Sequence, residues 1–332
     1  MIDRRRILHG AAALVTVLVL QGALTTPALA AKGSLRVVSL KFGSLNWLLQ
    51  TIKTEGLDKK AGINLDIIEV ATNQAGPVAL LAGEADVIVS DWPWAMRQRS
   101  LGQKLKFRPY SSSLGAVMVT KDAPIHSIGD LEGKKIGVAG SAIDKSWLLL
   151  RAFSRRTLGR DLADVAEPVF AAAPLVAEEL RNGRVDACLN FWTYAARLEG
   201  DGFRPMLAID DMFVKLGIEP SPAMVGFIWR EDAAEGKSAE LKAFFDAINE
   251  GNNLLATSDD AFARLRPLMR TKSDAEYFAL KAYYRAGIPK PWSAKQTESA
   301  EKLFNLLAAE GGRELIGNRT KFDPELFDGA AN

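Results

Sequence analysis

The sequence predicts an α/β fold of two lobes, each built on βαβ units and joined to the other by two crossover strands. Two observations lead to this prediction. Strands alternate with helical segments along most of the chain, and the order of these elements recurs at an offset of 100 residues. Alternating strands and helices favour parallel pairing, with helices covering the faces of each sheet. The N-terminal segment does not follow this alternation.

Residues 1–30 have the layout of a secretory signal peptide. Arg4, Arg5 and Arg6 form a basic region, an apolar stretch runs from Ala11 to Leu20, and Ala28-Leu29-Ala30 is a typical A-x-A cleavage sequence. The apolar stretch is short for a membrane span. We therefore expect cleavage after Ala30 and a periplasmic location. The arginines leave two export routes open, the general secretory (Sec) route and the twin-arginine route.

The composition excludes several classes of function. The 42 Lys and Arg residues nearly balance the 40 Asp and Glu residues, and they form no basic block, which argues against a nucleic-acid partner. Cys188 is the single cysteine and only two histidines occur. A His/Cys metal site and a triad built on His are therefore not expected. With no catalytic motif, the sequence predicts neither an enzyme nor a cofactor.

The pattern of apolar residues predicts the individual elements. In the first part of the chain, strands are expected at 35–40, 63–70 and 85–89, with a helix around 47–52. The second part repeats this order, with strands at 135–139, 169–170 and 185–189 and helices at 145–153 and 175–181. From Ser238 onward the chain is expected to be helical, with an apolar stripe, and to pack on one lobe.

The repeat is visible letter by letter. Residues 80–97 read LLAGEADVIVSDWPWAMR and residues 180–197 read LRNGRVDACLNFWTYAAR. Asp86 and Asp186 belong to a shared G-x-x-D sequence and are expected to order the turn into the following strand. Trp47 and Trp147 also match and are expected in the cores. The repeat predicts two related lobes.

Two extended segments, 114–120 and 224–230, are expected to link the lobes. Two crossings make the second lobe an insertion in the first. The predicted domains are therefore lobe 1, comprising 31–112 and 223–332, and lobe 2, comprising 113–222. A hinge is expected where the crossings pass.

Candidate ligand-binding residues follow from the expected sheets, because ligands of open α/β sheets sit beyond the carboxyl ends of the strands. The residues there are polar or aromatic. They are Lys41, Phe42, Ser44, Asn46, Asn73, Gln74, Asp91, Trp92, Trp94, Ser112, Ser141, Asp144, Asn190, Trp192 and Tyr194.

Two questions stay open among these candidates. Ser141 and Asp144 lie where a helix begins, a position that suits either a bound anion or an ordinary N-cap. Trp92 and Trp192 suit a scaffold as well as a ligand contact, whereas Trp94 and Tyr194 are expected to face the ligand. Asp91 would repel an anionic ligand unless it pairs with Lys41 or Lys145.

Several segments resemble the periplasmic substrate-binding proteins of nitrate/sulfonate/taurine-type ABC importers, a group that includes binding proteins for thiamine precursors. The most similar are 78–87, VALLAGEADV, and 127–138, SIGDLEGKKIGV. The resemblance implies a type II periplasmic-binding-protein-like fold that closes on its ligand. It also implies a membrane permease and an ATPase as partners, and we expect a monomer.

The resemblance does not identify the ligand. Such proteins often carry Trp-Glu-Pro after the last strand of the second lobe, where this chain has Trp192-Thr193-Tyr194. The aromatic residues and Asp91 favour a small polar organic molecule with a flat or cationic portion, and a sulfonate or carboxylate at Ser141 is the alternative. A sensor subunit that docks to a membrane receptor, or an exported enzyme, remains an alternative to transport.

Overall fold

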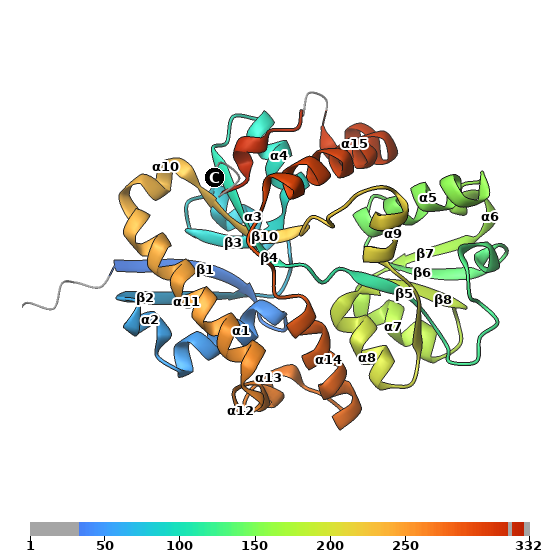
Figure 1. The fold of residues 1–332 in the computed structure, drawn as a ribbon, viewed down its shortest axis with the longest axis horizontal. Helices are drawn as coiled ribbons and strands as arrows, with labels where there is room; N and C mark the ends of the chain where they lie inside the picture. The colour runs from blue at the N-terminus through green and yellow to red at the C-terminus, as the bar shows by residue number, and fades with distance from the viewer. Residues whose placement is uncertain (1–32, 318–320, 329–332) are drawn as a thin grey trace, which may run out of the picture. The chain divides into compact units, whose positions relative to one another are not determined.

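The computed structural model describes residues 33–317 and 321–328, and the predicted signal peptide lies outside them. Two five-stranded sheets form the framework of this part of the chain (Figure 1). Within the described residues, no helix is long and apolar enough to cross a membrane.

The first sheet has the strand order β2-β1-β3-β10-β4. Strand β1 pairs in parallel with β2 and β3, whereas β10 runs antiparallel to both β3 and β4. The strands are β1 (Gly33–Leu40), β2 (Ile63–Val70), β3 (Val87–Asp91), β4 (Leu105–Ser111) and β10 (Val225–Arg230).

The second sheet repeats this arrangement in the order β7-β6-β8-β5-β9. Strand β6 pairs in parallel with β7 and β8, and β5 runs antiparallel to β8 and β9. The strands are β5 (Gly115–Val119), β6 (Lys135–Ala139), β7 (Glu167–Ala171), β8 (Ala187–Phe191) and β9 (Arg204–Ala208). The predicted two-lobed α/β fold class is confirmed.

The predicted crossover segments have a different place from the one expected. They form β5 and β10, the antiparallel fourth strands of the two sheets, and the connections between sheets are the residues just before them, 112–114 and 216–224. Strands β4 and β9 are absent from the elements predicted from the sequence. Both lie at sheet edges and mix polar residues and proline into a short apolar pattern, so neither shows the buried-strand signal.

Helices connect the strands of each sheet. Those of the first sheet are α1 (Ser44–Thr54), α2 (Leu57–Lys60), α3 (Ala75–Leu81) and α4 (Trp92–Ser100). Those of the second sheet are α5 (Lys145–Leu158), α6 (Leu162–Val165), α7 (Ala173–Arg181), α8 (Trp192–Gly200) and α9 (Ile209–Lys215), preceded by the 3₁₀ turn Ile128–Leu131.

The C-terminal section is helical, as predicted. It contains α10 (Glu231–Ala234), α11 (Ser238–Thr257), α12 (Asp259–Ala263), α13 (Arg266–Met269), α14 (Asp274–Ala286) and α15 (Ala294–Ile316), with 3₁₀ turns at Glu235–Lys237 and Pro324–Leu326. These helices contact elements of both sheets rather than one. Helix α11 packs on α1 and β1, α14 packs on α8, and α15 contacts both α4 and α5.

The repeated aspartates bond to the first strand of each sheet, whereas the sequence predicts that they order the turn into the third strand. The Asp86 carboxylate accepts the backbone N–H of Arg36 at 2.8 Å, and the Asp86 N–H donates to the Arg36 carbonyl at 2.9 Å. Asp186 makes the same pair of bonds with Lys135, both at 2.8 Å. In each sheet the aspartate therefore aligns the third strand with the first at the point where pairing begins.

The contact between α8 and α14 depends on a glycine. A Cβ atom on Gly200 would lie 2.5 Å from the Cα atom of Glu276, so the two helix backbones approach too closely for any side chain here. Arg197 of α8 also forms an ion pair with the buried Glu276 and donates to the Met269 carbonyl at 2.7 Å. Helix α14 is thus fastened to the second sheet.

The substitution Gly200→Ala should destabilise the chain, because the added methyl group must push α14 away from α8. We expect a loss of about 1–3 kcal/mol in the free energy of unfolding, measured by chemical denaturation. Gly236→Ala is the matched control, since a Cβ atom there meets no atom within 4 Å. Equal stability of the two variants would contradict the close approach of the helices.

The substitution Asp86→Asn should cost about 2 kcal/mol at neutral pH, because it weakens charge-assisted bonds from Arg36 and Lys237. Burial acts to raise the pKa of Asp86, but these partners outweigh it and hold the pKa below its usual range. The ionised carboxylate therefore stabilises the fold above the ordinary pKa of an aspartate, and the stabilisation disappears as the pH falls through the lowered pKa.

The difference between wild type and Asp86→Asn should accordingly shrink below about pH 4 in thermal unfolding scans. Asp122→Asn, at an exposed aspartate, is the control and should change stability little at either pH. A difference that stays constant down to about pH 2 would argue against the ionised Asp86 as the source.

Candidate ligand-binding site

Strand directions decide which loops can form a site. In the first sheet β1, β2, β3 and β4 share one direction, because β3 and β4 both run antiparallel to β10. In the second sheet β6, β7, β8 and β9 share one direction for the same reason. Each sheet therefore has one edge where the carboxyl ends meet, and the candidate residues follow these ends.

An ion pair joins the carboxyl-end loops of the two sheets. The Asp91 carboxylate, at the end of β3, lies 2.9 Å from the Lys145 ammonium at the start of α5. The other Asp91 oxygen accepts the backbone N–H of Trp94 and caps α4. Asp91 is thus neutralised by one of the two lysines that the sequence analysis named, and its repulsion of an anionic ligand is reduced.

The start of α5 is capped by the protein itself. The Asp144 carboxylate accepts the N–H groups of Ser146 at 2.9 Å and Trp147 at 3.4 Å. The start of α5 suited either a bound anion or an ordinary N-cap, and in the structure Asp144 is the N-cap. An anion bound at this helix start would have to compete with Asp144 for its donors.

Burial and neighbouring charges shift the pKa values of Lys145 and Asp144. Burial alone would lower the pKa of Lys145, but the two nearby carboxylates outweigh it, so the pKa is raised and the side chain stays charged. Burial raises the pKa of Asp144, opposed by Lys145 and reinforced by Asp91.

The loop after β1 presents an exposed aromatic ring. Phe42 is 61% exposed, and the Arg270 guanidinium lies 4.3 Å from the centre of its ring. Asn46 stabilises this loop, because its side-chain amide donates to the Lys41 carbonyl at 3.0 Å and to Glu69 at 3.1 Å. Lys41 and Phe42 are thus accessible, whereas Asn46 supports them.

Five of the candidates are buried in this structure: Ser44, Asn46, Trp92, Asn190 and Trp192. Trp92 packs edge-on against Phe327, and Trp192 packs edge-on against Trp47 with ring centres 6.1 Å apart. Ser44 accepts a hydrogen bond from Tyr110, and Asn190 donates to the Ala173 carbonyl. Their contacts are those of residues that position the strand ends, the scaffold role left open for Trp92 and Trp192.

The other candidates are at least partly accessible. Trp94 and Tyr194 each keep part of the ring exposed while the rest packs on a core cluster. The Ser112 backbone N–H is bound by the Gly287 carbonyl. The accessible set is Lys41, Phe42, Asn73, Gln74, Asp91, Trp94, Ser112, Ser141, Asp144 and Tyr194. Their contact with a ligand stays a prediction.

The predicted set of site residues lacks the residues at the carboxyl ends of the edge strands. Tyr110 near the end of β4 donates to Ser44, and Asp210 and Asp211 follow β9 at the same edge as the ends of β6 and β8. The available signal was short, an apolar run of Met206 to Ile209 directly before two acidic residues.

Comparisons with known proteins agree with this architecture. A family model described as "NMT1/THI5 like" matches residues 53–261. No curated protein sequence matches this chain.

Solved structures with the same fold include two sulfonate-binding proteins and an enzyme. The periplasmic aliphatic sulphonate binding protein SsuA from Escherichia coli is 18% identical, covering 89% of this chain and 96% of that one, with a TM-score of 0.68. The alkanesulfonate-binding protein SsuA from Xanthomonas axonopodis pv. citri, bound to MOPS, is 16% identical over 88% and 97%, with a TM-score of 0.67. The desulfurization enzyme DSZB is 18% identical over 90% and 96%, with a TM-score of 0.61.

The pair of Asp91 and Lys145 should contribute a small but measurable coupling between the two sheets. In a double-mutant cycle of Asp91→Asn and Lys145→Met, we expect a coupling free energy below about 1 kcal/mol, because both side chains remain partly exposed. Asparagine keeps an oxygen to cap α4, so the cycle isolates the ion pair.

Small-angle X-ray scattering supplies the second readout of this prediction. Loss of the pair should increase the radius of gyration, because the loops of the two sheets lose an attraction. The same cycle on Lys242 and Asp246, an exposed pair within α11, should leave the radius unchanged. Zero coupling together with an unchanged radius in the Asp91 and Lys145 variants would contradict the link.

Proposed function

Because this chain belongs to the NMT1/THI5-like family, we propose that it is an exported solute-binding protein of an ABC importer. It captures a small polar organic molecule between the carboxyl-end loops of its two sheets by hinge closure. One observation carries the proposal: the Asp91–Lys145 ion pair joins a loop of each sheet at 2.9 Å. Two such edges in contact form a natural place for a ligand.

The connections support closure as the capture step. The chain passes between the sheets through the short segments 112–114 and 216–224, so few backbone torsions separate the two sheets. Short connections of this kind act as hinges when two lobes close around a ligand. A ligand that contacts both edges stabilises the closed state by its difference in affinity for the two states.

The accessible side chains indicate what such a ligand offers. Trp94 and Tyr194 supply flat apolar faces for a planar or cationic portion, and exposed amides of Asn73 and Gln74 supply neutral hydrogen-bonding groups. The charges of Asp91 and Lys145 are already paired. We therefore favour a ligand recognised by stacking and hydrogen bonds over one recognised by a single strong charge.

The location and the partners that we propose follow from the two SsuA proteins that share this fold. The two SsuA proteins are described as periplasmic or alkanesulfonate-binding. We propose that this chain likewise works in the periplasm, as a monomer, and delivers its ligand to a membrane permease driven by an ATPase.

Native mass spectrometry of the purified mature chain should reveal a bound small molecule, which denaturing release then identifies. Trp94→Ala should weaken binding of the identified molecule about ten-fold, because it removes a stacking face. Phe278→Ala is the matched control, since Phe278 is an exposed aromatic inside α14, a helix that follows no strand directly.

Three outcomes would overturn the proposal. The first is the absence of any co-purifying molecule together with no thermal stabilisation by organic anions, amines or heterocycles. The second is equal loss of binding in Trp94→Ala and Phe278→Ala. The third is chemical turnover of the bound compound, which would place the chain with enzymes of this fold such as DSZB.

A further inference from the structure

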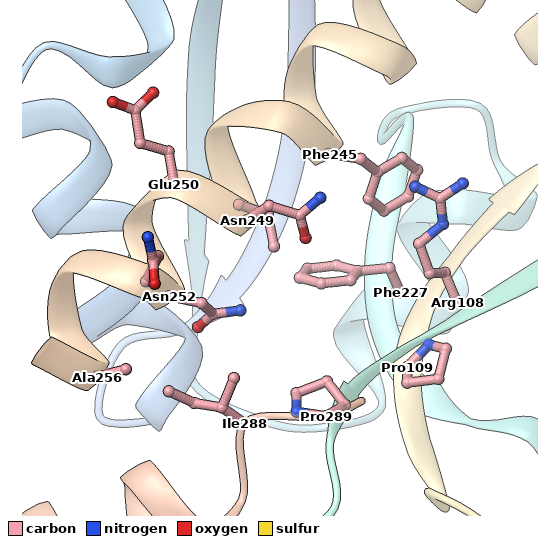
Figure 2. Close-up of a pocket in the computed structure, with 12 residues that line it drawn as sticks. Arg108, Pro109, Phe227, Phe245, Asn249, Glu250, Asn252, Ala256, Ile288 and Pro289 are labelled. Atoms are coloured by element: carbon pink, nitrogen blue, oxygen red, sulfur yellow. The ribbon is translucent and has the colours of Figure 1, made fainter. Parts of the chain in front are cut away.

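A cavity lies outside the carboxyl-end loops. It has a volume of about 570 Å³ and is bounded by β4, β10, α11 and the segment 288–289 (Figure 2). None of the fifteen candidate residues named from the sequence lines it. Small-molecule sites commonly have volumes of about 300–1,000 Å³, so the cavity is large enough for a ligand of its own.

The apolar lining of the cavity has a buried part and a partly exposed part. Phe227 and Phe245 pack against each other with ring centres 5.8 Å apart, and together with Ile248 they belong to one buried core cluster. The apolar side chains of the lining that remain partly exposed are Pro109, Ala256, Ile288 and Pro289. A planar apolar group placed against them would replace water on a surface that has no hydrogen bonds to offer.

The charged residues at the rim are already paired within the chain. The Arg108 guanidinium lies 3.9 Å from the centre of the Phe245 ring and donates to Asp328 at 2.9 Å. Glu250 forms an ion pair with Lys60, and Figure 2 shows its carboxylate turned away from the Asn249 amide and the Phe227 ring. A charged ligand would therefore find no unpaired counter-charge, which favours an uncharged one.

Three amides of α11 supply the polar side of the cavity: Asn249, Asn252 and Asn253. Figure 2 shows the Asn249 amide turned towards Phe227. The Asn252 carbonyl oxygen accepts the Tyr284 hydroxyl at 3.1 Å, which leaves the NH₂ group of Asn252 as a donor. Burial raises the pKa of Tyr284 far above its usual value, so the hydroxyl keeps its proton and fixes this orientation.

We propose that this cavity is a second ligand-binding site, which takes an uncharged molecule with a planar apolar group and hydrogen-bonding carbonyl, amide or hydroxyl groups. The apolar group lies against the partly exposed side chains of Ala256, Ile288 and Pro289, and its polar groups meet the amides of α11. Tyr284 is a positioning residue for Asn252. The proposal is independent of the function proposed for the carboxyl-end loops.

Benzamide and phenyl β-D-glucopyranoside are suitable uncharged probes, and benzoate is the matched anion. In NMR titrations of the ¹⁵N-labelled chain up to about 10 mM, the uncharged probes should shift the side-chain amide signals of Asn249, Asn252 and Asn253. Benzoate should bind at least about ten-fold more weakly than benzamide, because the one cation among the described lining residues, Arg108, is already paired with Asp328.

Matched variants locate the binding. Ala256→Trp fills the cavity and should abolish the shifts, whereas Lys242→Trp, at an exposed position of α11 outside the cavity, should preserve them. Tyr284→Phe should weaken benzamide binding and broaden the Asn252 signal more than those of Asn249 and Asn253. Trp94→Ala should leave benzamide binding unchanged, which separates this site from the carboxyl-end loops.

The proposal is overturned by any of three results. One is the absence of shifts at the three asparagines with both uncharged probes. Another is equal affinity for benzoate and benzamide. The last is unchanged binding in Ala256→Trp while thermal unfolding shows that this variant is folded.

Discussion

The position of β10 between β3 and β4 is the constraint on which the rest of the structure depends. Strand β10 comes after every strand of the second sheet in the sequence, yet it is the antiparallel partner of β3 and β4 in the first sheet. The first sheet is therefore complete only after the chain has returned from the second. Strand β5 has the equivalent place in the second sheet, between β8 and β9. Connectivity and hydrogen bonding together keep the two sheets attached through short connections.

Contacts between the two halves of the repeat follow from this arrangement. The Trp47–Trp192 contact joins the first helix of one sheet to the last helix of the repeated unit in the other. The fastening of α14 to α8 and the contacts of α15 with α4 and α5 add C-terminal links to both sheets. A hinge movement has to keep the contacts between buried side chains intact. It can break and re-form the contacts between partly exposed side chains, such as the one between Asp91 and Lys145.

The two candidate sites share one electrostatic feature. At the carboxyl-end loops Asp91 is paired with Lys145, and at the cavity beside α11 Arg108 and Glu250 are paired with Asp328 and Lys60. Compensating the charges internally lowers the cost of holding them near an apolar surface. Apolar surfaces and amides are then the groups left to recognise a ligand at either place.

The sequence by itself determined the strands with strong apolar patterns, the repeat and the loops that follow the strand ends. These features depend on residues near one another in the chain. Only the tertiary structure decided that Trp92 is buried under Phe327 while Trp94 keeps an exposed face, and that residues 108–109, 227, 245–256 and 288–289 enclose one cavity. The edge strands β4 and β9 were missed because polar residues and proline interrupt their short apolar patterns. Burial and cavities depend on side chains that distant segments contribute, and local periodicity contains no information about those segments.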